Sequence, residues 1–276
     1  MHIYAFSDEA SSSLAGQIAA MKRNGLDGME IRGVDGQNVA AITKEKAGEI
    51  LRRLKDEGLT VWSVGSPIGK IPLDGGGFKE HLDSLKHVLE IADVLECRNI
   101  RMFSFYMPEG VPFDDRRGEV IDRLGRMAEL ASGTGIVLCH ENEKGIYGDN
   151  AARCREILNA VPGLKCVFDP ANFIQCGQDV PEAWDLLGKD VHYMHIKDAL
   201  PDGSVVPAGK GIGHLPELLK AYAARGGEAV TLEPHLRVFD GLKDLEKDLK
   251  TPVPANTWPT ADAAFDAACN ALKALL

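Results

Sequence analysis

The chain has 276 residues, of which 45% are hydrophobic and 26% are charged, and its formal net charge at pH 7 is −10. This composition provides a core for one large α/β domain or for two smaller ones. The acidic balance argues against a nucleic-acid partner, because phosphate contacts need clustered Lys and Arg, and the sequence has no basic run of that kind.

Membrane and secretory signals are also missing from the sequence. No apolar run approaches the roughly 18 to 20 residues that cross a bilayer, so we expect no membrane partner. The first residues, MHIYAFSDEASSS, lack the basic start and apolar centre of a signal peptide. The six cysteines form no CxxC pair, which favours reduced thiols in a cytoplasmic protein.

Short apolar segments alternate with amphipathic segments along the chain, which predicts strands and helices in turn. The predicted strands lie at 3–6, 27–33, 59–65, 99–106, 133–141, 164–169, 191–196 and 229–233. The predicted helices lie at 14–25, 44–58, 78–96, 116–132, 150–161, 181–189, 214–227 and 262–276. Glycines at the ends of several helical segments are typical of left-handed caps.

Eight consecutive strand–helix units predict an α/β protein with a single (β/α)8 TIM barrel, a fold that usually takes about 250 residues. We therefore expect one domain over residues 1–276. The alternative is an open doubly wound sheet, which normally has a GxGxxG turn after its first strand, whereas this chain has SDEASSS. Residues 235–260 contain three prolines and predict a long loop between strand eight and the C-terminal helix, near the rim of the active site.

Each of the last four predicted strands finishes on a side chain that can bind a metal. In chain order these residues are Glu141, Asp169, His195 and Glu233. Side chains alternate along a strand, and the branched apolar Val230 and Leu232 are expected to face the helices, so Glu233 faces the barrel interior. The same parity directs the other three inward, and the carboxyl ends of barrel strands meet at one mouth.

Three carboxylates at one mouth raise one another's pKa unless a cation is present. A set of three oxygen donors and one nitrogen donor suits Mn²⁺ best, with Mg²⁺, Co²⁺ and Zn²⁺ as alternatives. Taken one at a time, each acid is better explained as a helix cap or a solvated loop residue. Four metal-competent residues at equivalent positions on consecutive strands favour one divalent metal site.

Five motifs surround these residues: HENEKGIYGD (140–149), FDPANF (168–173), HIKDA (195–199), PAGKGIG (207–213) and LEPH (232–235). They resemble the sugar phosphate isomerase/epimerase family of xylose-isomerase-like TIM barrels. The resemblance implies one divalent metal bound by Glu141, Asp169, His195 and Glu233. It also implies that Glu141 and Glu233 are the catalytic acid/base pair, that the substrate is a small carbohydrate, and that a homodimer is compatible with the chain.

The chain departs from the ketose 3-epimerases of that family at the expected substrate contacts. Asn172 stands where they carry a second histidine, and Pro201 stands where they carry a substrate-binding arginine. Lys197 has inward parity and is a candidate to bind a carboxylate, a keto oxygen or a phosphate, or to donate a proton. The alternative is that Lys197 pairs with Asp198 or Glu143.

Further candidates lie near the predicted mouth. Asn172 and Glu143 are candidate substrate contacts, with a Glu143–Lys197 salt bridge as the alternative for Glu143. His235 is expected to contact substrate or to hold a carboxylate. Ser66, like Lys70 in the same loop, is a candidate substrate contact.

Other polar residues are expected to be structural. Glu30 and Arg101 have inward parity and are expected to pair with each other inside the barrel. His140 and His192 are expected to be core histidines on the outer face of their strands. GKGIG (209–213) predicts a turn in preference to a phosphate-binding loop.

The residues favour a metal-dependent sugar isomerase or epimerase in carbohydrate metabolism, which abstracts a proton next to a carbonyl. The alternative is a lyase, as in the inosose dehydratases of the family, where the same abstraction is followed by loss of a β-hydroxyl. An endonuclease IV-like phosphodiesterase is disfavoured, because it needs two or three metals, more histidines and a basic DNA-binding face.

Overall fold

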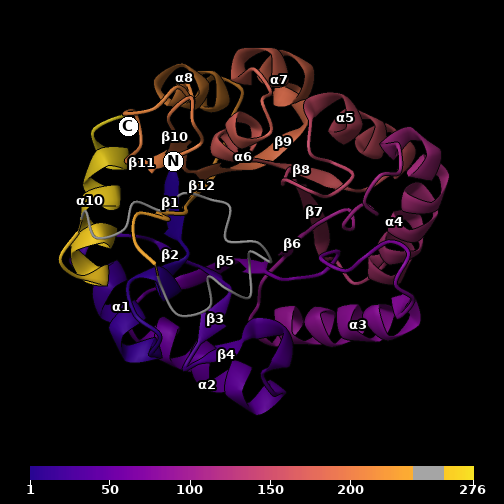
Figure 1. Cartoon of the computed structure of the whole chain (residues 1–276). Coiled ribbons are helices and arrows are strands. Elements are labelled where there is room, and N and C mark those ends of the chain that lie inside the picture. The colour runs from indigo at the N-terminus through magenta and orange to yellow at the C-terminus, as the bar shows by residue number, and fades with distance from the viewer. Residues whose placement is uncertain (239–257) are drawn as a thin grey trace.

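Eight parallel strands close into a barrel in this computed structural model, which describes residues 1–238 and 258–276. Their order around the barrel is β1-β12-β9-β8-β7-β6-β5-β2, and Figure 1 looks down the barrel with the helices outside. The strands are β1 (His2–Ala5), β2 (Gly28–Ile31), β5 (Thr60–Gly65), β6 (Asn99–Met102), β7 (Val137–Glu141), β8 (Lys165–Phe168), β9 (Val191–Ile196) and β12 (Ala229–Leu232). The predicted (β/α)8 fold is confirmed.

A helix follows each barrel strand and covers the outside of the barrel. These helices are α1 (Leu14–Arg23), α2 (Lys44–Asp56), α3 (Phe78–Val94), α4 (Arg117–Ala131), α5 (Ala151–Ala160), α7 (Val180–Leu187), α8 (Leu215–Ala224) and α10 (Ala261–Lys273). Several begin where a side chain accepts a hydrogen bond from the first turn: the cap is Ser13 in α1, Thr43 in α2 and Thr260 in α10.

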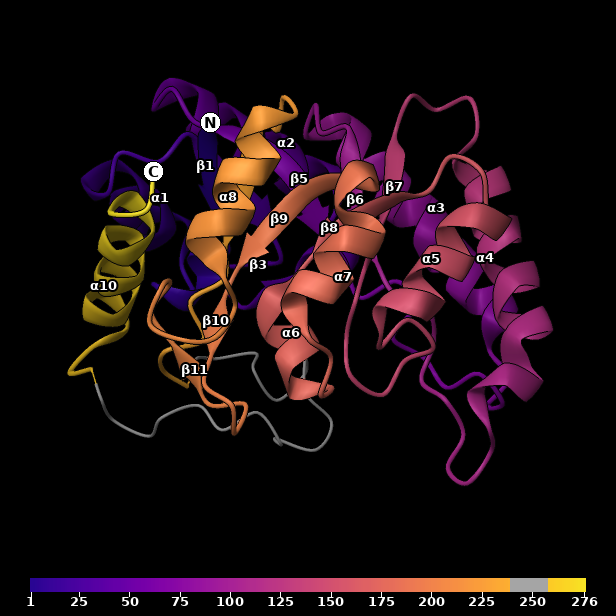
Figure 2. The ribbon, with the colours of Figure 1, turned by 90° about the horizontal axis from the view of Figure 1, so that it is seen from above.

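Several short elements were not predicted, because two to six residues show no measurable periodicity. They are the hairpin β3 (Gly33–Val34) and β4 (Gln37–Asn38), helix α6 (Pro170–Gln175), and the hairpin β10 (Asp198–Ala199) and β11 (Val205–Val206). Single 3-10 turns are η1 (Ser7–Glu9), η2 (Val39–Ala41), η3 (Phe113–Arg116) and η4 (Gly188–Asp190). Figure 2 shows α6 and the β10–β11 hairpin at the same end of the barrel.

The predicted alternation holds toward the carboxyl ends of the strands, whereas the register shifts within the β2–β5 and β8–β9 pairs. Val230 and Leu232 pack into the large core between strands and helices. Cys139, Val167 and Tyr193 form a separate small apolar cluster. These three come from the neighbouring strands β7, β8 and β9 and are cross-strand neighbours or nearly so, as expected for one layer inside the barrel.

Two further expectations can be compared with the structure. Among the described residues, no helix combines the length and the apolar character needed to cross a membrane. All six cysteines are free, as expected for reduced thiols. Residues 239–257, most of the predicted 235–260 loop, lie outside the described residues, and the single domain over residues 1–276 stays a prediction.

The loop with the sequence GKGIG folds around the buried carboxylate of Asp198. The carboxylate accepts hydrogen bonds from the backbone N–H groups of Gly209, Gly211 and Gly213 at 2.9–3.0 Å. A Cβ at Gly211 would lie 2.2 Å from the carbonyl oxygen of Ala199, so only glycine fits there. The loop amides therefore bind an internal carboxylate, which agrees with a turn and leaves no amide nest for phosphate.

Replacing Asp198 with asparagine should destabilise the protein. The amide group would turn an N–H₂ toward backbone N–H donors, and each buried donor left without an acceptor costs about 1–3 kcal/mol. We expect a loss of about 2–3 kcal/mol in the free energy of unfolding, measured by urea denaturation. Asp202→Asn, at an exposed turn position nearby, is the control and should change it by less than about 0.5 kcal/mol. Equal stability of the two variants would contradict this account.

Candidate metal centre

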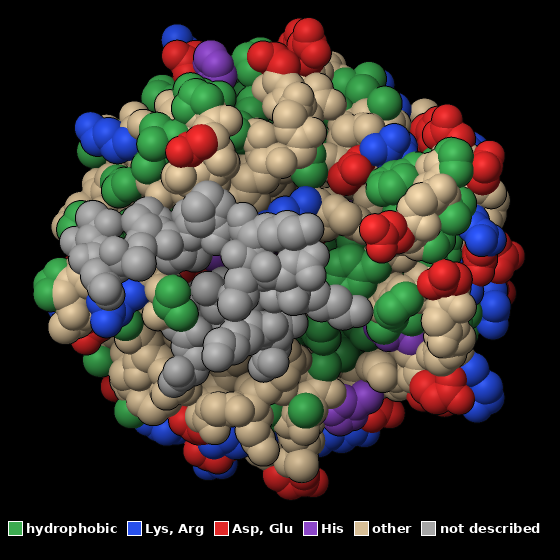
Figure 3. Space-filling view, in the orientation of Figure 1, with side chains coloured by type: hydrophobic (Ala, Val, Ile, Leu, Met, Phe, Trp, Pro, Cys, Tyr) green, Lys and Arg blue, Asp and Glu red, His purple; other side chains and the backbone are tan. Residues whose placement is uncertain are grey.

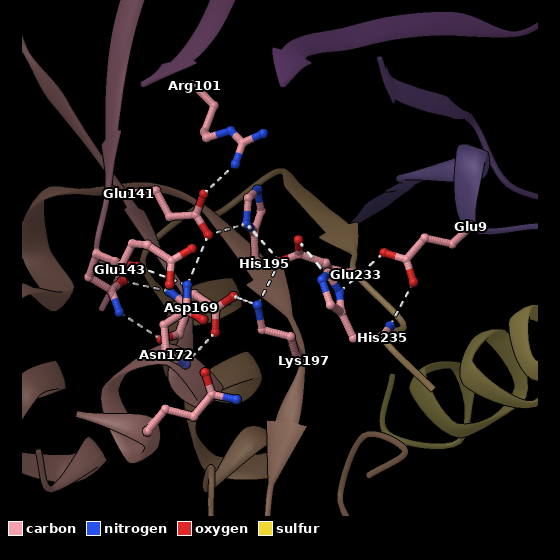
Figure 4. Close-up of polar contacts among 12 residues, drawn as sticks. Glu9, Arg101, Glu141, Glu143, Asp169, Asn172, His195, Lys197, Glu233 and His235 are labelled. Carbon is pink, nitrogen blue, oxygen red and sulfur yellow. Dashed lines mark hydrogen bonds and ion pairs between the residues drawn. The ribbon is translucent and has the colours of Figure 1, made fainter. Parts of the chain in front are cut away.

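The structure brings Glu141, Asp169, His195 and Glu233 together at the carboxyl ends of four neighbouring strands. All four side chains are buried, and one potential ligand atom from each lies within 4.8 Å of the others. Figure 4 shows His195 between Glu141 and Glu233, with Asp169 beside them. The convergence predicted from alternation is thus present in the structure.

Each of the four residues is placed by local structure. Glu141 is the last residue of β7, and His195 lies on β9 opposite Thr231 of β12. Asp169 caps α6, where its Oδ1 accepts a hydrogen bond from the backbone N–H of Asn172 at 2.9 Å. The backbone N–H of Glu233 donates to the carbonyl oxygen of Ile196, which extends the β9–β12 pairing by one residue.

The two glutamates are held in their ionised forms. Burial alone would raise the pKa of Glu141, but His195 and Arg101 outweigh it and lower that pKa to about 2. Arg101 Nη1 lies 2.9 Å from Glu141 Oε2. Burial is likewise outweighed at Glu233, where Lys197 and His235 hold the pKa well below its ordinary value. Both carboxylates are therefore negative at neutral pH.

Asp169 is the carboxylate with the least compensation. Burial raises its pKa to about 7, and Lys197 opposes this shift only in part. Its Oδ2 is buried without a hydrogen bond of good geometry, although the Lys197 ammonium lies 3.0 Å away. A buried carboxylate oxygen of this kind, beside two other carboxylates and an imidazole, fits a divalent ion of the Mn²⁺ or Zn²⁺ type.

Lys197 lies among the candidate ligands. Its Nζ is 3.0 Å from Asp169 Oδ2 and 3.0 Å from Glu233 Oε2. The predicted pairing with Asp198 or Glu143 is wrong, because Asp198 binds backbone amides and Glu143 pairs with Lys70 at 3.2 Å. The ammonium thus supplies, in the metal-free protein, part of the positive charge that a metal ion would supply.

His195 contacts a carboxylate through each ring nitrogen. Nδ1 lies 3.0 Å from Glu141 Oε1 and 3.5 Å from Glu233 Oε2, while Nε2 lies 3.1 Å from Glu30 Oε2. The predicted Glu30–Arg101 ion pair is wrong: Arg101 pairs with Glu141, and Glu30 contacts His195 and Tyr193. Burial would lower the pKa of His195, yet Glu141 and Glu30 hold it well above its ordinary value.

A small cavity adjoins the candidate ligands. It is lined by Arg32, Lys70, Arg101, Glu143, Asn172, Lys197, Glu233 and His235. Asn172 donates from Nδ2 to Glu141 Oε1 at 3.2 Å, so it contacts a candidate ligand as well as the cavity. His235 Nδ1 lies 3.2 Å from Glu9 Oε1 and 3.7 Å from Glu233 Oε1.

Ser66 is the predicted site residue that the structure does not bring to the cavity. Its buried hydroxyl donates to the carbonyl oxygen of Arg101 at 2.6 Å and accepts from the N–H of Ile68. It therefore fixes the loop after β5. His140 Nε2 lies 2.9 Å from Ser104 Oγ, as expected of a bonded core histidine. The outer-face prediction for His192 is wrong: its Nε2 lies 2.8 Å from Asn99 Oδ1 of β6, which two strands separate from β9, and its ring stacks on Trp62 of β5, so it lies inside the barrel.

The sequence interpretation missed a second acidic cluster beside the first. Glu9, Glu233 and His235 also present atoms within 4.8 Å of one another. The Arg32 guanidinium lies 3.1 Å from Glu9 Oε1 and 3.3 Å from Glu233 Oε1, so it supplies the positive charge there. Glu9 follows β1 much as the other acids follow their strands, and that position was the available signal.

The matching family model is described as the xylose isomerase-like TIM barrel, and it covers residues 18–251. The chain belongs to this family. A comparison with curated protein sequences found no significant match.

Solved structures with the same fold include three that cover nearly the whole chain. The probable 3-DHS dehydratase AsbF of Bacillus anthracis is 18% identical with a TM-score of 0.75, covering 99% of this chain and 98% of its own. The IOLI protein with a binding zinc atom is 16% identical with a TM-score of 0.76, covering 100% and 98%. An L-ribulose 3-epimerase is 20% identical with a TM-score of 0.76, covering 100% and 94%. At these identities the likeness shows the fold.

Removing the Lys197 ammonium should strengthen metal binding. In Lys197→Met, Asp169 and Glu233 lose the cation that a metal must displace, and an uncompensated buried carboxylate costs about 3–5 kcal/mol. We expect Mn²⁺ to bind at least about tenfold more tightly, measured by isothermal titration calorimetry, while the metal-free variant unfolds at lower temperature. Lys70→Met removes a cavity cation that pairs with Glu143 and should leave the affinity within about threefold. Weaker binding by Lys197→Met would contradict competition.

Metal binding should also depend on pH. A metal ligand must be deprotonated, so Asp169, with its pKa of about 7, and His195, with its raised pKa, must both lose protons. The deprotonated fraction of each grows as pH rises, so affinity for Mn²⁺ should increase between pH 6 and pH 8. Titrations in buffers of different ionisation enthalpy should show proton release, and a pH-independent affinity would contradict this arrangement.

Proposed function

We propose that this chain is a divalent-metal-dependent isomerase or epimerase of a sugar or keto-sugar derivative. The observation that carries the proposal is the pair of ionised glutamates, Glu141 and Glu233, which come from strands on either side of Asp169 and His195 in the barrel. Two carboxylates on either side of one site can remove a proton from a carbon and return one to it.

Glu141, Asp169, His195 and Glu233 would hold the metal, for which Mn²⁺ is the first choice and Mg²⁺, Co²⁺ and Zn²⁺ are alternatives. When bound, the ion would polarise the substrate carbonyl and stabilise the negative charge of an enediolate. The zinc atom of the IOLI structure and the activity named for the L-ribulose 3-epimerase support this assignment.

The other cavity residues would orient the substrate. Asn172 and Glu143 can bond to hydroxyl groups, and His235 can do so beside Glu233. Lys197 lines the cavity and, once a metal has taken its place, would be free to bond to a substrate oxygen. With these assignments the proposed substrate is a small carbohydrate. A homodimer is compatible with this function.

The charges favour an uncharged substrate over a phosphorylated one. Each cation that lines the cavity already faces an acid: Arg32 faces Glu9, Lys70 faces Glu143, Arg101 faces Glu141 and Lys197 faces Asp169. A phosphate would bring up to two more negative charges into this buried site. A neutral polyhydroxy ketone brings none.

A lyase is the second candidate, and Lys197 is the observation that favours it. A buried ammonium beside Asp169 and Glu233 is an acid that can protonate a departing β-hydroxyl after the first proton has been removed. The similar structure of the probable dehydratase AsbF supports this alternative. A DNA-cleaving role is less well supported, because Figure 3 shows acidic and basic side chains interspersed around this face of the described residues.

Exchange of solvent protons tests the proposal. Candidate ketoses and keto-inositols are incubated in D₂O with the Mn²⁺-loaded protein, and deuterium incorporation is followed by NMR and mass spectrometry. We expect Glu141→Gln and Glu233→Gln each to lose at least about 100-fold in exchange rate, because each removes a group that transfers the proton. The exposed Glu129→Gln is the control and should exchange at the wild-type rate.

Bound Mn²⁺ is measured in every variant, so that loss of a ligand is separated from loss of the base. A deuterated product of unchanged elemental composition supports an isomerase or epimerase, and a product lighter by one water supports the lyase. Full exchange in either glutamine variant would rule out the assigned roles. A wild-type protein that binds no divalent ion would remove the basis of the proposal.

A further inference from the structure

The carboxylate of Glu30 lies on the side of the His195 ring that faces away from Asp169 and Glu233, and it is not one of the four candidate ligands. Glu30 on β2 places Oε2 at 3.1 Å from His195 Nε2. The side chains of both residues are fully buried. β2 and β9 are not neighbours in the barrel, so this contact crosses the barrel interior.

Glu30 is itself held in place by hydrogen bonds. Tyr193 donates its hydroxyl to Glu30 Oε1 at 3.0 Å, and the same hydroxyl lies 3.0 Å from Ser63 Oγ. The result is a chain of polar contacts from Ser63 on β5 through Tyr193 to Glu30 and then to His195. Three strands, β2, β5 and β9, thus contribute to this network, and β2 and β5 lie across the barrel from β9.

The ring of His195 is fixed on its faces and edges as well. Phe6 packs against it in a T-shaped arrangement with 5.2 Å between ring centroids, and Tyr193 does so at 5.6 Å. A half-turn of the imidazole would place the C–H groups Cδ2 and Cε1 against Glu141 and Glu30 and would lose both of these contacts. Nδ1 therefore stays on the side of Glu141 and Glu233, and Nε2 stays on the side of Glu30.

We propose that Glu30 is a positioning residue that fixes the proton of His195 on Nε2 and so leaves the Nδ1 lone pair for the metal. This inference rests on the metal centre of the proposed function. An ionised carboxylate can only accept hydrogen bonds, so the nitrogen that faces it must be the protonated one in the neutral ring. The other tautomer would leave Nε2 and Glu30 as two acceptors in contact and would direct an N–H at the metal.

Glu30 also adds a negative charge behind the ligand nitrogen. A carboxylate that accepts the second ring N–H makes a histidine ligand more basic and orients it, and loss of such a partner typically costs about 10–100-fold in metal affinity. Burial would lower the pKa of Arg101, but Glu141 and then Glu30 raise it, so this guanidinium supplies part of the charge that compensates the buried Glu30 carboxylate.

The test measures Mn²⁺ affinity and the position of the His195 proton in Glu30→Gln. We expect Mn²⁺ to bind about 10–100-fold more weakly, by isothermal titration calorimetry, because the neutral amide is a poorer acceptor for the Nε2 proton. In protein with ¹⁵N-labelled histidine and loaded with Zn²⁺, the wild type should show His195 protonated on Nε2, with slow exchange of that proton with water. His195→Gln identifies the signal, and in Glu30→Gln the proton should exchange faster.

Two further variants separate positioning from stability. Cys139→Ala creates a cavity in the same barrel interior, and it should lower the unfolding temperature without changing Mn²⁺ affinity. Tyr193→Phe leaves the Glu30 carboxylate in place but removes one of its hydrogen bonds, and it should weaken binding by less than about tenfold. Should Glu30→Gln not fold, Glu30→Asp gives the same comparison, since its carboxylate ends one methylene short of Nε2.

The outcomes distinguish this inference from the proposed function. If the wild type binds no divalent ion, the metal centre and the role of Glu30 both fail. If the wild type binds Mn²⁺ and Glu30→Gln binds it equally well with an unchanged Nε2 proton, only the role of Glu30 fails. Equal weakening by Glu30→Gln and Cys139→Ala would assign the effect to lost stability and would also overturn it.

Discussion

The burial of three carboxylates at one end of the barrel is the constraint on which the site depends. Charges are buried in proteins only when they are paired, and each of these acids has a cation from a different strand: Arg101 of β6 for Glu141, Lys197 beside β9 for Asp169, and Arg32 beside β2 for Glu233. The barrel interior is correspondingly polar toward this end. The large apolar core lies outside the strands, and the small cluster of Cys139, Val167 and Tyr193 lies inside.

Not all of the cations that pair with these carboxylates would compete with a metal ion for them. Arg101 pairs with Glu141, and Arg32 pairs with Glu233. Lys197 contacts two candidate ligands, Asp169 and Glu233, at once. Arg101, Arg32, Lys197 and His195, whose pKa is raised, balance these carboxylates, and burial raises the pKa of Asp169 to about 7. A divalent ion bound as proposed would displace Lys197 and the protons of His195 and Asp169, which would couple its binding to the movement of a side chain and to proton release.

The sequence was sufficient for the fold and for the convergence of the four candidate ligands, because both follow from alternation and from the parallel order of strands. It was insufficient to predict which of the buried side chains contact one another. Alternation predicts that Glu30, Arg101 and Lys197 point inward, but which inward groups meet depends on the stagger of strands across the barrel. The predicted Glu30–Arg101 pair and the pairing of Lys197 with Asp198 or Glu143 were therefore wrong. The hydroxyl of Ser66 bonds the backbone, since a hydroxyl after a strand serves the backbone as readily as a ligand. Helix α6, which places Asn172 against Glu141, is too short to show a period.

The two proposed catalytic glutamates also differ in the donors that bind their carboxylates. Glu141 receives hydrogen bonds from Arg101 and Asn172, and neither donor has to move when a metal binds. Glu233 is held by Arg32 and by Lys197, and Lys197 is the group that a metal displaces. In the loaded site Glu141 therefore keeps two fixed donors, while Glu233 keeps one and has His235 nearby. A carboxylate with fewer fixed donors is the stronger base, so in the proposed reaction Glu233 would take the first proton and Glu141 would hold the metal and the substrate in position.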